Sequence, residues 1–235
     1  MARRKDLLKE YKDKRDFEKT PEPSGGKGPP PPAKSPERFF CVQKHLASQL
    51  HYDFRLEHNG VLLSWAVPKG PSLNPKDKRL AMQVEDHPLE YGQFEGVIPE
   101  GYGAGIVMLW DTGTWEPDDE SICIDDALKK GQLKFQLHGY KLKGSWVLIR
   151  TKGPMRGQGS DKPSWLLIKH KDFWSGPVDV TAAAPRSVKT DRELAEILAA
   201  EEPDVWPGQR PAEGRVAGKA LREVMLEAGQ IRRRP

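Results

Sequence analysis

Short segments rich in β-branched and aromatic residues, each ended by glycine, proline or another turn-forming residue, recur between residues 39 and 174. Seven of them stand out, at 51–57, 61–67, 79–86, 105–110, 134–139, 145–151 and 164–170. Many short strands separated by turns are typical of a β-sandwich or β-barrel. We therefore predict an all-β fold with minor helices, in which residues 38–176 form a single closed β-barrel.

The two flanks of this region differ from it in composition. Residues 1–37 are predicted to be a basic arm, with a short helix within 3–17, followed by a linker whose stretch PEPSGGKGPPPPAKSP (21–36) cannot hold regular structure. Residues 177–235 are predicted to be a tail with short helices at 190–202 and 219–229, and a further helix is expected at 124–130. The predicted architecture is thus one barrel with an N-terminal arm and a C-terminal helical appendage.

Several classes of protein are excluded by simple features of the sequence. The first 17 residues are too charged for a signal peptide, and no run approaches the roughly 20 apolar residues of a membrane span. The two cysteines, Cys41 and Cys123, lie far apart and indicate neither a disulfide framework nor a cysteine-rich zinc module. We expect a monomeric cytoplasmic protein without a membrane partner. The net charge of +4 is too small to establish a nucleic-acid partner.

Polar and apolar residues alternate in the segment 51–56 (HYDFRL), so in a strand the polar ones share one face. That face carries His51, Asp53 and Arg55. His45 falls on the same face if the strand continues backwards, and it stays nearby if residues 46–49 form a turn. Two imidazoles and a carboxylate suit manganese, zinc or iron(II). We predict that His45, His51 and Asp53 bind one divalent cation inside the barrel.

Arg55 follows this predicted metal site at the distance of one strand repeat. Two residues along a strand span about 6–7 Å, so the guanidinium would lie within reach of an anion held at the metal. A guanidinium can bind a phosphate through two parallel hydrogen bonds. Arg55 is therefore predicted to bind substrate phosphate.

A second segment, 79–87 (RLAMQVEDH), also alternates, and its predicted polar face carries Arg79, Gln83, Glu85 and His87. His87 is expected at the mouth of the barrel, placed to protonate a leaving oxygen or to bind phosphate, and the hydroxyl of Tyr91 could join it. Gln43, Gln83 and Glu85 are expected to support the ligands. The glycine-rich stretch 97–107 lacks the lysine and the helix of a phosphate-binding P-loop, and is predicted to be a tight connection.

A long part of the sequence resembles the 3′-phosphoesterase domain of bacterial DNA ligase D. The resemblance is carried by FCVQKHLASQLHYDFRLEHNGVLLSWAVPKG, QVEDHPLEYGQFEGVIPEGYGAGIVMLWDTGTWEP, KLKGSWVLIRT, WLLIKHKD and RDFEKTPEP, within roughly residues 11–175. It implies a β-barrel enzyme of nonhomologous end joining that uses Mn²⁺ to remove a 3′-terminal ribonucleoside and then the 3′-phosphate. Its implied substrate is a DNA primer–template 3′ end, so the protein would associate with the nucleoid. Ku, DNA ligase and polymerase are the implied partners.

The resemblance also assigns roles to individual residues. The metal ligands fall on His45, His51 and Asp53. The phosphate-binding and catalytic residues fall on Arg55 and His87, with Tyr91 and Lys69 as helpers, and on Arg15, Asp16 and Glu22 of the arm; Arg79 is added to the phosphate-binding group. No KxDG motif or polymerase domain is recognisable, so we expect a free-standing phosphoesterase, and we recognise no resemblance in its last sixty residues.

Two other functions fit the same residues. An iron(II) oxygenase could use His51, Asp53 and His87 as its 2-His-1-carboxylate triad. A non-catalytic DNA-end binding module could use the basic arm and the terminal IRRRP to contact phosphates, with structural histidines.

Overall fold

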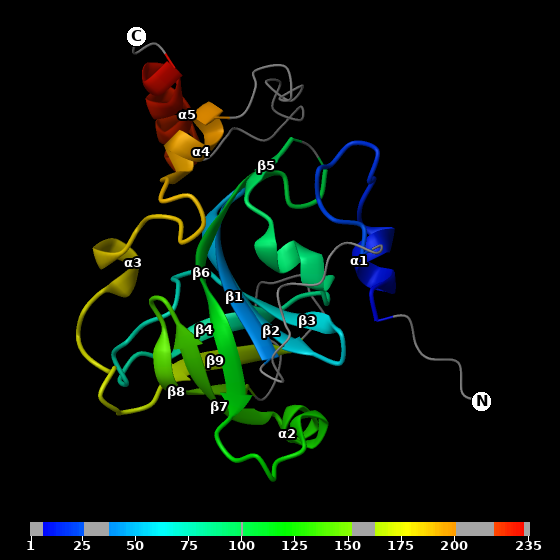
Figure 1. Ribbon diagram of the computed structural model, residues 1–235, viewed down its shortest axis with the longest axis vertical. Helices are drawn as coiled ribbons and strands as arrows, with labels where there is room; N and C mark the ends of the chain where they lie inside the picture. The colour runs from blue at the N-terminus through cyan, green and yellow to red at the C-terminus, as the bar shows by residue number, and fades with distance from the viewer. Residues whose placement is uncertain (1–6, 26–37, 100, 152–162, 201–218, 233–235) are drawn as a thin grey trace.

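A computed structural model describes residues 7–25, 38–99, 101–151, 163–200 and 219–232 of the chain. Within them, nine antiparallel strands form one sheet: β1 (Arg38–Leu46), β2 (Leu50–His58), β3 (Val61–Val67), β4 (Arg79–Gln83), β5 (Gly96–Ile98), β6 (Gly105–Pro117), β7 (Gln132–Gly139), β8 (Lys143–Arg150) and β9 (Ser164–Lys169). The sheet order is β1-β2-β3-β4-β9-β8-β7-β6-β5, and β1 also pairs with β6. That pairing closes eight strands into a barrel, with β5 added along the first half of β6 (Figure 1). The predicted closed barrel is confirmed.

Aromatic side chains fill the interior of the barrel. The rings of Phe54 on β2 and Phe135 on β7 lie 5.9 Å apart, although these strands are not neighbours in the sheet. Trp65 on β3 and Trp165 on β9 meet in the same way at 6.0 Å. Each such ring removes about 150–250 Å² from water, so the interior of the barrel is a packed apolar core.

Helices cover the barrel at several places (Figure 1). The described helices are α1 (Lys9–Asp13), the 3-10 helix η1 (Leu89–Gln93), α2 (Ile124–Lys130), α3 (Val180–Ala183), α4 (Leu194–Ala200) and α5 (Lys219–Arg232). Ile124 of α2 and Ile197 of α4 belong to the same apolar core as the barrel. Arg232 of α5 donates hydrogen bonds to the last carbonyls of α4. The C-terminal helices are therefore packed on the barrel through α4.

Some predicted elements differ from the observed ones. Residues 38–46 form a strand of their own, because a turn at 47–49 reverses the chain between β1 and β2. α1 is a single short helix, and residues 3–6 of the predicted helix lie outside the described residues, as do most of the predicted linker, residues 201–202 and the last three residues of the chain. Neither β5 nor α3 was expected. Cys41 and Cys123 are both free thiols, as predicted.

None of the helices in the described ranges combines the length and the apolar character that spanning a membrane requires.

Candidate metal centre

The β1–β2 hairpin brings the two predicted histidine ligands together. His45 and His51 are direct cross-strand partners, and so are Gln43 and Asp53. Directly opposed residues in an antiparallel pair have their Cβ atoms about 4.5–5.5 Å apart. The two imidazole centroids accordingly lie 4.7 Å from each other. Of the two arrangements considered for His45, the turn is the one observed.

The three ligands lie on the outer face of the barrel wall. Tyr52 and Phe54 point into the apolar core, so the residues that alternate with them point outwards. The prediction of a cation inside the barrel is therefore wrong. The outward face is nevertheless covered: Arg55 is 1% exposed, and its guanidinium lies 4.9 Å from the ring of Tyr91 in η1.

The donor atoms of His45, His51 and Asp53 all lie within 4.8 Å of one another. Nδ1 of His45 is 3.6 Å from one carboxylate oxygen of Asp53, and Nε2 of His51 is 3.8 Å from the other. The second nitrogen of each ring faces a backbone carbonyl, that of Gly103 at 2.9 Å and that of Gln49 at 3.0 Å.

These carbonyls select one tautomer of each neutral ring. A carbonyl oxygen only accepts, so in the neutral ring the nitrogen that faces it carries the proton, and the lone pair lies on the nitrogen that faces Asp53. A metal-binding imidazole requires that lone pair. With one carboxylate the set has the composition of a three-ligand transition-metal site that keeps open positions. The residues present therefore fit a divalent cation.

Asp53 is held in its charged form. Burial by itself would raise the pKa of this carboxyl, but Arg55, whose terminal nitrogen donates to it at 3.1 Å, outweighs that effect together with His45 and His51. The pKa of Asp53 consequently lies well below its usual range. An ionised carboxylate is the form that a metal binds.

Arg55 is held by the protein on three sides. Its guanidinium donates to the side chains of Gln43 (2.8 Å), Ser64 (2.7 Å) and Asp53 (3.1 Å). Gln43 in turn donates to the carbonyl of Tyr91, which ties η1 to the barrel wall. Within the described parts of the chain, three of the five N–H groups of Arg55 are thus used, and two remain for another acceptor. Orienting Asp53 is one function of this arginine that the contacts establish.

His87 reaches the same face through a bend after β4. Its Nδ1 lies 2.9 Å from the carbonyl of Glu85, and its Nε2 accepts a hydrogen bond from Arg15 at 3.3 Å. Burial, with further contributions from Arg55 and Arg15, lowers the pKa of His87 well below its ordinary value. These partners indicate a neutral ring that carries its proton on Nδ1. In this state Nε2 is a hydrogen-bond acceptor. Protonating a leaving oxygen, as predicted from the sequence, would require a protonated Nε2.

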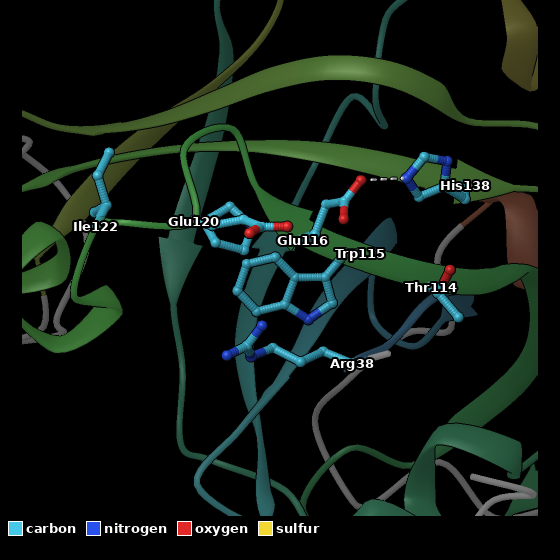
Figure 2. A pocket seen from close by; sticks show the side chains of 8 residues that line it. Arg38, Thr114, Trp115, Glu116, Glu120, Ile122 and His138 are labelled. Carbon is cyan, nitrogen blue, oxygen red and sulfur yellow. Dashed lines mark hydrogen bonds and ion pairs between the residues drawn. The ribbon is translucent and has the colours of Figure 1, made fainter. Parts of the chain in front are cut away.

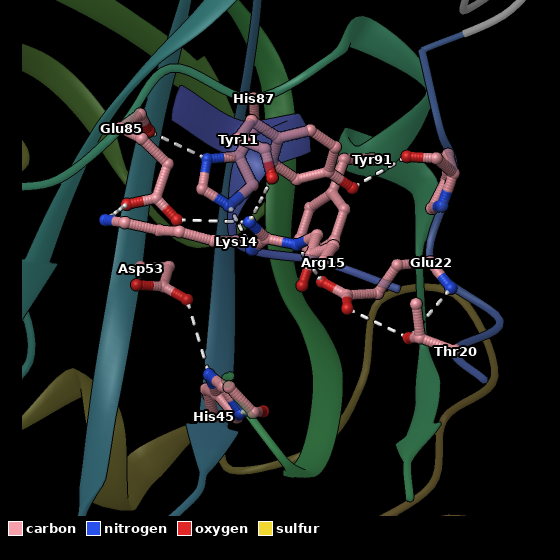
Figure 3. Close-up of polar contacts among 12 residues, drawn as sticks. Tyr11, Lys14, Arg15, Thr20, Glu22, His45, Asp53, Glu85, His87 and Tyr91 are labelled. Atoms are coloured by element: carbon pink, nitrogen blue, oxygen red, sulfur yellow. Dashed lines mark hydrogen bonds and ion pairs between the residues drawn. The ribbon is translucent and has the colours of Figure 1, made fainter. Parts of the chain in front are cut away.

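The N-terminal arm (residues 7–25) lies over this face and is joined to it by buried ion pairs, as Figure 3 shows. Arg15 is bound to Glu22 at 2.8 Å and to Glu85 at 3.2 Å, and Lys14 contacts the other oxygen of Glu85 at 3.0 Å. The side chains of Arg15, Glu22 and Glu85 are each at most 4% exposed. Arg15 and Glu22 therefore do come to the site.

Aromatic packing completes the cover. Tyr11 of α1 is fully buried, its ring lies 4.9 Å from that of His87, and its hydroxyl donates to the carbonyl of Pro23. Tyr91 is buried with its ring 4.8 Å from His87. Asp16 does not join them: it is exposed, and its carboxylate faces the turn that follows α1.

Three other predicted residues lie elsewhere. Gln83 points into the barrel, where its carbonyl accepts from the indole N–H of Trp165, so its predicted position behind the ligands is wrong. The prediction placed Gln83 and Glu85 on one outward face of a single strand. In the structure β4 ends at Gln83, which faces inwards, and the bend that follows turns Glu85 outwards. Lys69 and Arg79 line a separate hollow in the loop between β3 and β4.

Four contributors to the centre were not predicted from the sequence: Tyr11, Lys14, Ser64 and the carbonyl of Gly103. Ser64 could have been found. The Asn59–Gly60 dipeptide is a strong signal for a two-residue hairpin, and the register it sets pairs Arg55 with Ser64. The contact with Gly103 depends on how the glycine-rich loop closes over β1, which no local pattern indicates.

A second hollow lies at the opposite end of β1, around Arg38 and Trp115 (Figure 2). Glu116, Glu120 and His138 line it, and the Glu116 carboxylate lies 3.0 Å from the His138 imidazole, with both side chains about half exposed. Among the described residues the only group of three or more possible metal ligands is His45, His51 and Asp53. We therefore assign no metal chemistry to this hollow. The oxygenase alternative required His87 as a ligand together with His51 and Asp53, but His87 does not belong to this group.

Comparison with known proteins relates the chain to one family of DNA repair proteins. Residues 43–150 match the family described as the DNA Ligase D 3′-phosphoesterase domain. The multifunctional non-homologous end joining protein LigD of Pseudomonas aeruginosa is 50% identical over 219 residues, which cover 90% of this chain and 24% of that protein. The LigD proteins of Mycobacterium bovis (45% over 149 residues, 63% of this chain and 19% of theirs) and Mycolicibacterium smegmatis (41% over 177 residues, 71% and 21%) are also similar.

The chain spans about a fifth to a quarter of the length of these relatives. The Pseudomonas match leaves out 10% of the 235 residues, or about 24. The match therefore extends into the last sixty residues, in which no resemblance was recognised from the sequence alone.

Proposed function

Because this chain belongs to the DNA ligase D 3′-phosphoesterase family, we propose that it is a divalent-metal-dependent phosphoesterase that processes the 3′ ends of DNA. The proposed substrate is a primer–template end that carries a 3′-ribonucleotide or a 3′-phosphate. The proposed cofactor is Mn²⁺, and the product is a 3′-hydroxyl. The observation that carries the proposal is the preset donor group of His45, His51 and Asp53 beneath an arm of buried charges.

The charges around the site support an anionic substrate. Three cations and three carboxylates balance there: Lys14, Arg15 and Arg55 against Glu22, Asp53 and Glu85. The ligand imidazoles bind a metal in their neutral form. Adding one divalent cation leaves an excess charge of two, which favours a negatively charged phosphate group, either the phosphodiester or the 3′-phosphate. A neutral substrate would leave that buried charge without a partner.

The side chains can be given separate parts in the reaction. When bound, a divalent cation would polarise the phosphoryl group and supply a reactive water. Arg55 keeps Asp53 ionised and oriented, and its two remaining N–H groups can bind a phosphate oxygen. Nε2 of His87 can accept a proton from the attacking water, since the ring is neutral and buried. Arg15, which now donates to His87, can turn to the substrate phosphate instead.

The proposal is tested with a primer–template that carries one 3′-ribonucleotide, incubated with the protein and Mn²⁺. We expect the primer to lose its terminal ribonucleoside, leaving a 3′-phosphate that is then removed. Products are resolved by size, and their 3′ ends are identified by ligation. His51→Ala should abolish both steps, whereas His138→Ala, which removes an exposed imidazole elsewhere, should not.

Two outcomes would reject the proposal. Wild-type protein that binds the DNA but never cleaves it would support the binding-module alternative. Uptake of oxygen with iron(II) and 2-oxoglutarate, without release of phosphate, would support the oxygenase.

The relatives are named as non-homologous end joining proteins, and we propose the same pathway for this chain, with Ku, DNA ligase and polymerase as its partners.

A further inference from the structure

Two loops leave the barrel at the same rim as the metal centre. Val67, the last residue of β3, pairs with Tyr52, beside His51, so the loop 68–78 begins next to the centre. Arg79, the first residue of β4, pairs with Leu167 near the end of β9, so the connection 170–178 emerges beside that loop. The two loops are joined, because the amide of Gly176 donates to the carbonyl of Leu73.

The first loop contains a basic hollow. Its lining includes Lys69, Lys76, Lys78 and Arg79 and one acidic residue, Asp77, whose carboxylate already accepts from Arg79 at 3.1 Å. The three lysines are exposed. Clustered cations around an open hollow are what a phosphate group would bind.

The second loop presents an aromatic pair to solvent. Phe173 is 89% exposed and Trp174 is 47% exposed, and their rings are perpendicular at 5.2 Å. The ammonium of Lys143 lies over Trp174 at 4.8 Å. The loop is fixed, because the carboxylate of Asp172 accepts from the amides of Trp174 and Ser145. Large apolar residues are seldom left so exposed in a fixed loop unless they meet a partner.

We propose that these two loops form a single-stranded DNA binding surface that leads away from the end held at the metal centre. We call it the rim surface. It comprises the two loops and the strand ends beside them, with Lys69, Lys76, Lys78, Phe173 and Trp174 on the loops, Arg79 at the start of β4 and Lys143 at the start of β8. Lysines and arginine would contact phosphates, and the rings would stack on bases, the combination typical of single-strand binding folds. From β2 to β9 the rim crosses three strand spacings, roughly 14 Å, so one short stretch of strand can reach both ends.

The cations of the rim surface, Lys143 beside the rings and the lysines of the neighbouring hollow, favour this occupant over a protein. An aromatic pair flanked by cations is complementary to a polyanion whose bases offer flat faces. The inference rests on the proposed function, because it is a DNA end at the metal centre that gives the surface a strand to bind. Binding and cleavage can nevertheless be measured separately.

Binding is measured first, with metal-free full-length protein and a fluorescent oligothymidylate of about 12 nucleotides, within the range that single-strand binding folds cover. We expect Phe173→Ala to weaken binding about 5- to 100-fold, the loss associated with one stacked base. Because Phe173 is almost fully exposed, its removal should leave the fold intact. Leu226→Ala, which removes an exposed apolar side chain on α5, should have no effect.

The lysines are tested by the dependence of the affinity on salt. Each phosphate contact to a single strand contributes about 0.7 to the slope of log affinity against log salt. Lys76→Ala and Lys78→Ala should each lower the slope by about that amount, and Lys134→Ala, an exposed lysine on β7, should not. Equal effects in the control variants would overturn the proposal, as would unchanged binding in Phe173→Ala or equal competition by a DNA duplex.

Cleavage then separates this inference from the proposed function. Phe173→Ala should raise KM for a primer–template with a long single-stranded template overhang. It should leave a short substrate, a primer–template without an overhang, unaffected, because only an overhang can reach the aromatic pair. A slower reaction on the short substrate would place Phe173 in the catalytic site and overturn the inference. If wild-type protein cleaves neither substrate, the proposed function fails while the binding measurements still decide the rim surface.

Discussion

Arg55 shows how one side chain can set the state of the metal centre. Its guanidinium is shared among Gln43, Ser64 and Asp53, and it packs against the ring of Tyr91. A planar group with five fixed donors can satisfy several acceptors at once, whereas a lysine ammonium acts as a point charge. The carboxylate of Asp53 therefore depends on an arginine at this position for its charge and its orientation.

Arg55→Lys should consequently lose both activity and stability. We expect turnover to fall at least about 100-fold, and the free energy of unfolding to fall by about 2–4 kcal/mol, because buried acceptors lose their donors. Turnover is measured on the 3′-ribonucleotide primer, and stability by urea denaturation. Arg150→Lys, at an exposed arginine of β8, is the matched control. Near-normal rates in Arg55→Lys would contradict the assigned function of this arginine.

His87 should make the stability of the protein depend on pH. Its pKa is depressed in the folded state, so the unfolded state binds more protons at acidic pH. The stability contributed by the neutral ring is complete above its unfolded pKa of about 6.5 and is lost as pH falls towards the folded value.

The stability advantage of wild type over His87→Gln should therefore shrink as pH falls from about 7.5 to about 5. The slope can reach about 1.4 kcal/mol per pH unit, the limit for one proton. Urea denaturation at several pH values measures it, with His138→Gln as the exposed control. A pH-independent difference would show that His87 is not held neutral.

At the scale of elements, the arm is held by a small number of buried charges. Arg15 lies between Glu22 and Glu85, and Lys14 also pairs with Glu85. Because α1 is short, the arm has little helical stability of its own. Its order therefore depends on these ion pairs and on the burial of Tyr11.

Glu85→Gln should release the arm without unfolding the barrel, since Arg15 and Lys14 would both lose an ionised partner. We expect trypsin to cleave the arm about 10-fold faster or more, corresponding to an opening free energy lower by about 1.4 kcal/mol or more. Cleavage sites are identified by mass spectrometry. Glu116→Gln, which removes an exposed carboxylate from β6, should not change the rate. An unchanged rate in Glu85→Gln would show that other contacts hold the arm.

β2 and β4 show which side-chain orientations can be predicted from the sequence and which cannot. The face of β2 was predicted correctly because His51, Asp53 and Arg55 alternate with large apolar residues that must enter the core. On β4 the alternation was misleading, since the small Ala81 and the polar Gln83 face the interior. Gln83 satisfies an indole N–H there, a requirement that comes from β9 and is invisible in the sequence of β4.

The arm shows a different limit. Its composition alone indicated a basic helix and linker, and only the resemblance pointed to Arg15 and Glu22. Burial of Arg15 results from partners about seventy residues away, so no local pattern could predict it. The closed barrel, in contrast, follows from repeated strand and turn signals and was predictable in outline.

For the whole molecule, metal binding should couple to stability. A ligand that binds only the folded state adds about 2.7 kcal/mol at a hundredfold excess over its Kd. We expect Mn²⁺ to raise the thermal midpoint of chelator-treated protein and to restore its activity, and Mg²⁺ alone to restore little, since imidazole ligands suit transition metals better. His51→Ala should show neither effect. Full activity with Mg²⁺ alone would contradict the assignment of the cofactor.

The central claim is that His45, His51 and Asp53 share one cation on the outer face of the barrel. Anomalous diffraction from crystals grown with Mn²⁺ tests it most directly, because the scattering of the metal locates it without reference to activity. We predict one strong peak within coordination distance of Nδ1 of His45, Nε2 of His51 and the carboxylate of Asp53. A peak elsewhere in the molecule, with these three side chains free of metal, would contradict the account.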